Sequence, residues 1–199
     1  MKTGLDYTAS GEKRGFDIAV ASLLLPGKRI GELIVKRLAA QSSGLELPAI
    51  VVQERMGQYH QTFAIQKFTT LHPTTELPLG GWAVKLRHSG IDELAQLANI
   101  RAGDMSFTGP RPLLVPEYEE TRDALSPKLG RQWDNVVRAA KPGLYSSYAI
   151  YSHTRSAGDP NGPEVRAEMD IRDFQDASMR YDIALTAQFI GIALARRLK

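Results

Sequence analysis

Hydrophobic and polar positions predict one long helix near the start of the chain. Residues 13–40 combine an apolar first half with an amphipathic second half, and Pro26-Gly27 predicts that the helix is broken or bent between them. Residues 1–12 are polar and are expected to form a flexible N-terminus. The longest apolar stretch, residues 18–26, is too short to span a bilayer, which needs about 20 apolar residues.

The second half of this helix has one apolar face. Apolar residues recur there at the spacing of successive helical turns, and basic residues lie mostly on the other faces. This composition is typical of a helix that lies in a membrane interface. The segment alone favours a plainer interpretation, an ordinary helix packed on a soluble core. The apolar residues are Ile30, Leu33, Ile34 and Leu38, and the basic ones are Lys28, Arg29, Lys36 and Arg37.

Two short apolar segments predict a β-hairpin. Residues 48–53 and 62–68 have the composition of strands, and residues 57–60 between them can form the turn. The next segment, residues 70–81, is rich in proline and glycine and predicts a loop. A small hairpin-based sheet is therefore expected.

A helix is predicted over residues 91–101. Ser89 has the residue type and position of its N-cap, and Gly103 is placed to end it. Residues 103–112 then read as a loop, because two glycines and two prolines interrupt any period.

The remainder of the chain is predicted to be mostly helical. Lys141-Pro142-Gly143 ends one helical region, and residues 144–163 have no clear period. No internal repeat or linker divides the chain, so one α+β domain is expected, mostly helical with a small sheet. The further helices are expected near residues 115–125 and 127–139 and, in two pieces that meet near Ser178, from residue 164 to a basic end at Arg196, Arg197 and Lys199.

Composition excludes several classes of protein. The chain has no cysteine, which excludes disulfides, thiolate catalysis and cysteine-based zinc sites. Its four histidines are far apart in sequence and disfavour a zinc enzyme. The formal net charge is only +3, without a run of like charges, so no nucleic-acid partner is expected. A cleaved signal peptide is rejected because Asp17 interrupts the apolar region.

Asp92-Glu93 is the first candidate for chemistry. Adjacent helical positions point about 100° apart, so both carboxylates can face one cavity only where a helix begins. At that end the helix dipole stabilises a carboxylate, and free amides can bind phosphate. An acidic variant of the capping box, Ser89-x-x-Asp92, explains the pair without any function and is favoured on the pair alone.

Arg111 is the second candidate. It lies in Gly109-Pro110-Arg111-Pro112, and the two prolines restrict its backbone so that its planar fork has a fixed direction. A fixed fork suits bidentate binding of a phosphate. A tight structural turn with a solvated arginine fits the local sequence equally well.

The sequence resembles the bacterial sugar transferases, the monotopic phosphoglycosyl transferases that begin the assembly of capsules, exopolysaccharides and lipid-linked glycans. The resemblance extends over about 185 residues and rests on a long ordered string rather than on one short motif. Its elements are Lys13-Arg14-x-Phe16-Asp17, Gln53-Glu54-Arg55-x-Gly57, Phe63-x-Ile65-x-Lys67-Phe68, Ile91 to Ile100, Gly103-Asp104-Met105-Ser106, Gly109 to Pro112, Lys141 to Leu144, Glu168-Met169-Asp170 and Ser178-x-x-x-Asp182-Ile183.

The resemblance implies a two-step reaction. Asp92 would attack the sugar-linked phosphorus of a UDP-sugar and expel UMP, and polyprenyl (undecaprenyl) phosphate would then take the phosphosugar from the aspartate. The diphosphate needs Mg²⁺, and Glu93 matches the metal ligand of the family. Arg111 would hold phosphate oxygens, with Lys67 and Arg87 as weaker candidates for the same task.

The resemblance also implies a place in the cell and a domain. Residues 13–199 would form the transferase domain, with residues 13–40 as its membrane-associating segment. The expected location is the cytoplasmic face of the bacterial inner membrane, where the chain would be monotopic or peripheral. The sequence leaves a homodimer open and does not identify the sugar.

Departures from the family pattern keep a second hypothesis open. Ser22 and Pro26 are not adjacent and charges begin at Lys28, unlike the longer apolar helix of the family, and residues 148–153 replace a string expected to meet the nucleotide or the sugar. The loop after Phe68 is short, and Ala95 stands where the family has a proline. The alternative is a catalytically silent relative that binds nucleotide sugar, lipid phosphate or a partner glycosyltransferase.

Overall fold

The structure is a computed structural model that describes residues 4–154 and 162–197, without the side chains of residues 153, 154, 190 and 192–197. Its described part is mostly helical, with two small two-stranded sheets, as the predicted α+β class requires. The basic side chains expected at the C-terminal end lie outside the described residues.

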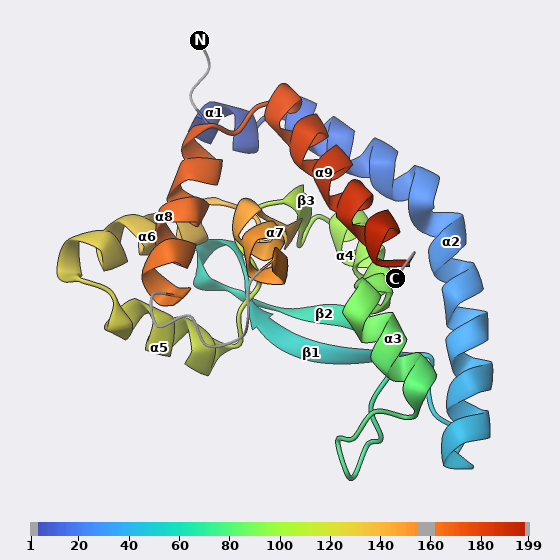
Figure 1. Cartoon of the computed structure of the whole chain (residues 1–199). Coiled ribbons are helices and arrows are strands. Elements are labelled where there is room, and N and C mark those ends of the chain that lie inside the picture. The colour runs from blue at the N-terminus through green and yellow to red at the C-terminus, as the bar shows by residue number, and fades with distance from the viewer. Residues whose placement is uncertain (1–3, 155–161, 198–199) are drawn as a thin grey trace.

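The long N-terminal helix α2 (Gly11–Ser43) is continuous over 33 residues. Its start is capped by Ser10, which accepts a hydrogen bond from the Lys13 backbone N–H, and its end by Gly44 in the left-handed conformation. The predicted helix is therefore confirmed, and of the two alternatives at Pro26, a break or a bend, the structure excludes the break. The helix bends along its length without interruption (Figure 1). A proline inside a helix favours a bend, because it lacks the N–H that would bond to the preceding turn.

The expectation of a flexible segment 1–12 is wrong for residues 4–12. They form helix α1 (Gly4–Thr8) and the first residues of α2. Tyr7 is buried, and its hydroxyl donates a hydrogen bond of 2.8 Å to Asp182 near the other end of the chain. Polar composition missed this because the packing partner lies 175 positions away.

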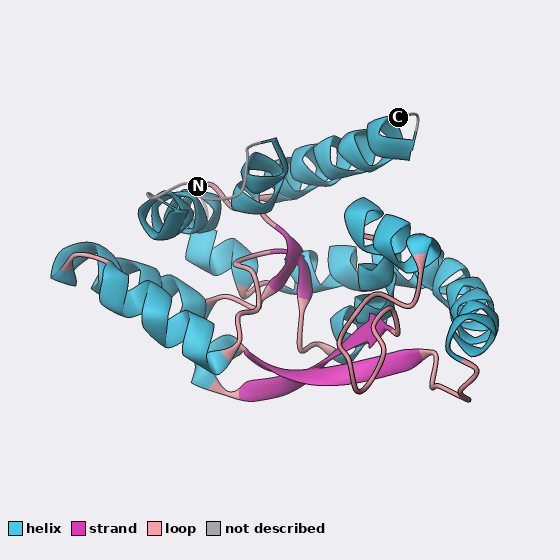
Figure 2. Ribbon diagram, turned by 60° about the horizontal axis from the view of Figure 1, so that its bottom comes forward, coloured by secondary structure: helices cyan, strands magenta, loops and turns pink. Residues whose placement is uncertain are grey.

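Strands β1 (Ile50–Met56) and β2 (Thr62–Phe68) form the predicted antiparallel hairpin, in register from Ile50–Phe68 to Met56–Thr62. Its turn contains the short 3₁₀ helix η1 (Gln58–His60). The hairpin lies along one side of the molecule with helices over one of its faces (Figure 2). In Figure 1 it extends from the α5–α6 side to the α3 side.

Helix α3 (Gly81–Ser89), the 3₁₀ helix η2 (Ile91–Gln96) and α4 (Leu97–Ala102) follow. Ser89 is not an N-cap: it ends α3, and its Oγ donates to the Leu86 carbonyl. Gly90 reverses the chain at φ 70°, so the predicted helix 91–101 begins with a 3₁₀ segment. Gly103 closes it as expected, with φ 102°.

A second sheet was missed by the sequence analysis. Strand β3 (Ser106–Thr108) pairs in parallel with β4 (Gly143–Tyr145). Each strand has three residues, too few for a two-residue period to show. The pairing joins the glycine- and proline-rich loops that follow β3 and precede β4.

The remaining helices are α5 (Val115–Ala124), α6 (Pro127–Ala139), α7 (Ser147–Thr154), α8 (Gly162–Gln175) and α9 (Met179–Arg197). All except α7 match predicted helices, and α8 and α9 meet near Ser178 as expected. Residues 147–154 are helical although the sequence shows no period there. One hydrophobic core joins α2, the hairpin, α4, β3 and α9, and a second joins α5, α6 and α8.

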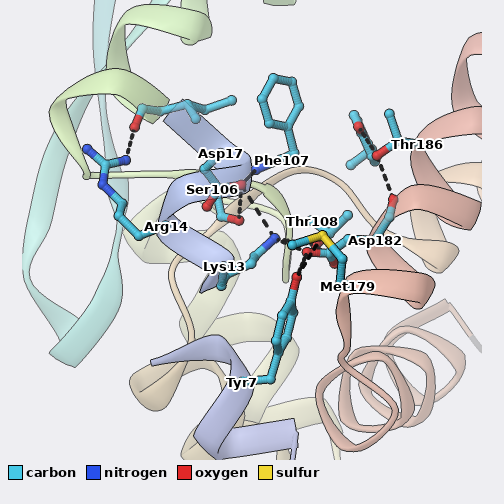
Figure 3. A network of polar contacts seen from close by, with 12 residues as sticks. Tyr7, Lys13, Arg14, Asp17, Ser106, Phe107, Thr108, Met179, Asp182 and Thr186 are labelled. Carbon is cyan, nitrogen blue, oxygen red and sulfur yellow. Dashed lines mark hydrogen bonds and ion pairs between the residues drawn. The ribbon is translucent and has the colours of Figure 1, made fainter. Parts of the chain in front are cut away.

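A buried polar network connects the two ends of the chain (Figure 3). Lys13 on α2 is only 5% exposed, and its ammonium lies 2.6 Å from Asp182 on α9 and 3.4 Å from Asp17. Asp17 accepts hydrogen bonds from Ser106 Oγ and the Phe107 backbone N–H, which fixes β3. A buried cation between two carboxylates is stable only while all three side chains are present.

Replacing Lys13 by methionine should lower the free energy of unfolding by about 3–5 kcal/mol, because the carboxylates of Asp17 and Asp182 stay buried without their cation. Urea or thermal unfolding measures this loss. The matched control is Arg122→Met, which removes an exposed ion pair with Asp123 on α5 and should leave stability almost unchanged. Equal effects of the two variants would contradict the structural role of Lys13.

Candidate active site

Asp92 is a buried carboxyl in the first turn of η2. It is 8% exposed, and burial raises its pKa to about 6. The neighbouring Glu93 contributes to this rise, while Lys67 and Arg87 oppose it. The ionised form of Asp92 is therefore disfavoured, as is that of the buried Asp170 on α8. Shifts of this kind cluster at functional sites but also occur in structural networks.

Glu93 faces Arg111, which lies between the two prolines of its loop. Arg111 Nη1 lies 3.7 Å from Glu93 Oε1, and the Arg111 side chain is 44% exposed. The structure therefore places Arg111 beside Glu93, the neighbour of Asp92 in the chain. Because the pair is long and partly solvated, it leaves the guanidinium able to bind another anion.

Two glycines hold the Arg111 loop in place. Gly143 donates its backbone N–H to the Pro110 carbonyl at 2.9 Å, and Gly109 donates to the Tyr145 carbonyl at 3.3 Å. A Cβ on Gly143 would lie 2.2 Å from the Gly109 nitrogen, so only glycine allows the loops to approach this closely. The direction of Arg111 therefore depends on this backbone contact as well as on the prolines.

One small pocket contains most of the predicted cations. Its lining includes Arg55, Lys67, Glu93, Gln96, Arg111 and Pro112. Burial lowers the pKa of Lys67, and the nearby Arg55 and Arg111 lower it further. The pocket gathers positive charge from β1, from β2 and from the loop after β3. Its volume of about 10 Å³ holds about one water molecule, so an anionic ligand would bind at its mouth.

Arg55 was missed as a site residue. The sequence analysis noted it only as part of the hairpin motif, yet its side chain lines the pocket beside Glu93 and Arg111. The position of Arg55 in the sequence does not show that it lines this pocket. Alternate side chains of a strand point to opposite faces, and the sequence does not tell which face of the hairpin meets the Arg111 loop.

Arg87 lies outside that pocket. It is in the last turn of α3 with an exposed side chain, and its charge lowers the pKa of Asp92. The structure thus separates the predicted phosphate-binding residues: Lys67 and Arg111 share the pocket with Glu93, whereas Arg87 acts on Asp92 from α3.

Asp92 and Glu93 suit a magnesium ion that takes its other ligands from water and from bound phosphate groups. Within the described ranges, no group of three or more histidine, aspartate or glutamate side chains is placed to hold a metal ion. Asp92 and Glu93 are adjacent and repel each other, which a divalent cation would relieve. Mg²⁺ is commonly bound by one or two carboxylates together with water and substrate phosphates, so this donor set fits it.

Helix α7 begins shortly after the pocket. Gly143 and Leu144 line the pocket, and Ser147 starts the helix that contains the atypical residues 148–153. The Arg166 guanidinium lies 4.9 Å from the centre of the Tyr148 ring. A contact of this segment with the nucleotide or the sugar stays a prediction.

A larger cavity of about 380 Å³ lies on the other side of the paired loops. Gly109, Pro110 and Lys141 line it together with Lys13 and Asp182 of the buried network. None of Asp92, Glu93 or Arg111 is among its lining residues. We therefore place the candidate site at the small cationic pocket, which Glu93 lines next to Asp92 in the chain, and not at this cavity.

Comparison with known proteins identifies related sequences. The profile of the family described as "Bacterial sugar transferase" matches residues 8–196. A putative undecaprenyl-phosphate N-acetylgalactosaminyl 1-phosphate transferase of Bacillus subtilis is 38% identical over 76 residues, which are 33% of this chain and 42% of that protein.

Two further relatives align over more of the chain. A UDP-N-acetylgalactosamine-undecaprenyl-phosphate N-acetylgalactosaminephosphotransferase of Aeromonas hydrophila is 26% identical over 92% of this chain and 43% of its own length. A UDP-glucose:undecaprenyl-phosphate glucose-1-phosphate transferase of Caulobacter vibrioides is 32% identical over 66% of this chain and 51% of its own length. The chain thus spans about half of these relatives or less.

Replacing Asp92 by asparagine should stabilise the protein at pH 8 but not at pH 4. The folded-state pKa of about 6 exceeds the ordinary value of 3.8, so the folded protein binds the proton more tightly and loses stability as the pH rises between these values. The change in the free energy of unfolding that Asp92→Asn causes should be more favourable above pH 6 than at pH 4 by about 2–3 kcal/mol. Urea unfolding at both pH values measures the difference, and an equal effect at both would contradict the perturbed carboxyl.

Proposed function

The chain belongs to the bacterial sugar transferase family, and from this membership we propose that it transfers a phosphosugar from a UDP-sugar to a polyprenyl phosphate. The observation that carries the proposal is the buried Asp92 beside the Glu93–Arg111 pair. The names of the relatives support the reaction class, since they refer to transfer of sugar phosphates to undecaprenyl phosphate. Those names differ in the sugar, so we propose no particular one.

In the proposed first step, Asp92 attacks the sugar-linked phosphorus. An oxygen of its carboxylate forms a bond to that phosphorus while the bond to UMP breaks, and the electron pair leaves with the UMP oxygen. Burial disfavours the charged carboxylate. Spreading its charge into the phosphoryl group relieves this cost and so favours the attack. A raised pKa near 6 still leaves Asp92 mostly ionised at neutral pH.

Positive charge in the pocket supports this step. Arg111 can hold phosphoryl oxygens with its fork, and Lys67 supplies a point charge from β2. Glu93 would hold Mg²⁺, which would neutralise charge on the diphosphate. In the second step the phosphate of the lipid attacks the same phosphorus, the bond to Asp92 breaks, and the aspartate is restored.

We propose that α2 brings the lipid acceptor to the site by lying on the cytoplasmic face of the membrane. None of the helices in the described ranges is both long and apolar enough to cross a bilayer. Leu23, Ile30, Leu33 and Ile34 are exposed on α2, on the side opposite to the buried Ala21, Val35 and Ala39. An exposed apolar stripe flanked by basic residues suits interfacial binding. The proposal includes no oligomeric state.

Asp92→Asn should abolish chemistry, because an amide of the same size is a poor nucleophile. Incubation of the wild type with the right UDP-sugar and Mg²⁺, without lipid, should add one phosphosugar to the protein, seen as an intact-mass shift mapped to Asp92. The variant should show no adduct, and its UMP release should fall by roughly 10³-fold or more.

Glu93→Gln is the informative companion variant. It should slow UMP release and weaken the dependence on Mg²⁺ without moving the attachment site. An Asp92→Asn protein that releases UMP at the wild-type rate would end the case for this nucleophile. A folded wild type that binds nucleotide sugar but forms no adduct with any UDP-sugar would favour the catalytically silent alternative.

The apolar face of α2 should hold the protein on lipid vesicles. Replacing Leu23 and Leu33 by aspartate should reduce co-sedimentation with vesicles containing anionic phospholipid, because each change removes buried apolar area and adds like charge. Leu5→Asp, an exposed leucine of α1, is the matched control and should bind as the wild type does. Full binding of the double variant would refute α2 as the attachment surface.

A further inference from the structure

Arg55 is a buried cation that the protein satisfies only in part. It is 7% exposed, and its Nη2 donates to Gln53 Oε1 at 2.7 Å. Its Nη1 makes long contacts with the Pro112 carbonyl at 3.4 Å and Glu117 Oε2 at 3.3 Å. Its buried Nε has no hydrogen-bond partner among the residues that the structure describes. A buried donor without a partner is destabilising, so its retention needs an explanation.

The charges around Arg55 add to this cost. Burial lowers the pKa of Arg55, and although Glu117 opposes the shift, the charge of Arg111 lowers the pKa further. Lys67 is in the same situation, with its pKa lowered by burial and then by Arg55 and Arg111. Among the described residues, the Lys67 ammonium has no hydrogen-bond or ion-pair partner, although its electrostatic interactions include Glu93 and Asp92. Three cations and one carboxylate, Glu93, thus line one small pocket.

A purely structural role explains only part of this arrangement. The contact with Glu117 could make Arg55 a structural link between β1 and α5. Such a link does not require a second cation, Lys67, beside it. Mutual repulsion among the cations lowers stability unless a ligand compensates it. Because the cations come from three separate segments, a ligand with two neighbouring anionic groups can contact more of them than a ligand with one.

We propose that Arg55 is a binding residue of a diphosphate site, which it forms together with Lys67 and Arg111. The inference rests on the proposed function, since the ligand would be the diphosphate of the UDP-sugar. Arg55 serves in two ways. Its Nη1 contact with the Pro112 carbonyl holds the loop that carries Arg111, and its buried charge makes the pocket favour a diphosphate over a monophosphate.

The test measures binding of inorganic pyrophosphate and inorganic phosphate by calorimetry at one fixed Mg²⁺ concentration, with no sugar or lipid. The wild type should prefer pyrophosphate by about 10-fold or more. Arg55→Gln and Lys67→Gln should each weaken pyrophosphate binding by about 10-fold, which corresponds to about 1.4 kcal/mol, and Arg55→Lys should restore part of it. The exposed Arg131→Gln and Lys128→Gln on α6 are matched controls and should bind as the wild type does.

Thermal unfolding separates this role from a structural one. Lys67→Gln should lower pyrophosphate affinity while the melting temperature of the ligand-free protein stays close to that of the wild type, because the repulsion of Lys67 by Arg55 and Arg111 is offset by its attraction to Asp92 and Glu93. A purely structural role of Arg55 predicts that Arg55→Gln lowers the melting temperature and leaves the affinity for pyrophosphate unchanged. If Arg55→Gln does not fold, Lys67→Gln and Arg55→Lys decide the question. Wild-type affinity in these variants, or no preference for pyrophosphate in the wild type, would overturn the inference.

UMP release by the same wild-type preparation keeps the two proposals apart. A protein that releases UMP, but whose pyrophosphate affinity does not depend on Arg55, refutes the diphosphate site and leaves the transferase function standing. A protein that binds pyrophosphate through Arg55, but releases UMP from no UDP-sugar, supports the site and refutes the function.

Discussion

The buried ammonium of Lys13 is the interaction on which the other parts of this structure depend. It lies between Asp17 of its own helix and Asp182 of α9, and Thr108 of β3 completes its surroundings. Asp17 in turn accepts hydrogen bonds from β3. One buried charge therefore fixes the first long helix, the last helix and a central strand relative to one another, because each of its partners would be left unsatisfied without it.

The position of β3 then determines the position of the candidate site. The strand pairs with β4, and the loops beyond them approach so closely that Gly109 and Gly143 are in backbone contact. Arg111 follows directly and lies next to Glu93. Strand β3 thus connects the buried network to the site. A change that distorts the network would therefore also displace Arg111.

The site itself contains charge that the free protein does not balance well. Asp92 is buried beside another carboxylate, and Arg55, Lys67 and Arg111 are gathered beside Glu93. Groups of this kind reduce stability, so they are retained where binding or catalysis uses them. The apolar face of α2 follows the same logic, since exposed apolar side chains in the free protein are useful only where a partner surface covers them.

The sequence by itself determined the local elements and the residue types of the site. Periodicity, cap residues and proline positions located α2, the hairpin and α5, α6, α8 and α9, because these signals act over a few neighbouring residues. The motif string identified Asp92, Glu93 and Arg111. Only the tertiary structure decided that Ser89 ends a helix, that residues 4–12 are ordered, that β3 pairs with β4, and that Arg55 belongs to the site while Arg87 lies outside the pocket. Each of these depends on contacts between segments far apart in the chain, which carry no signal in the local pattern.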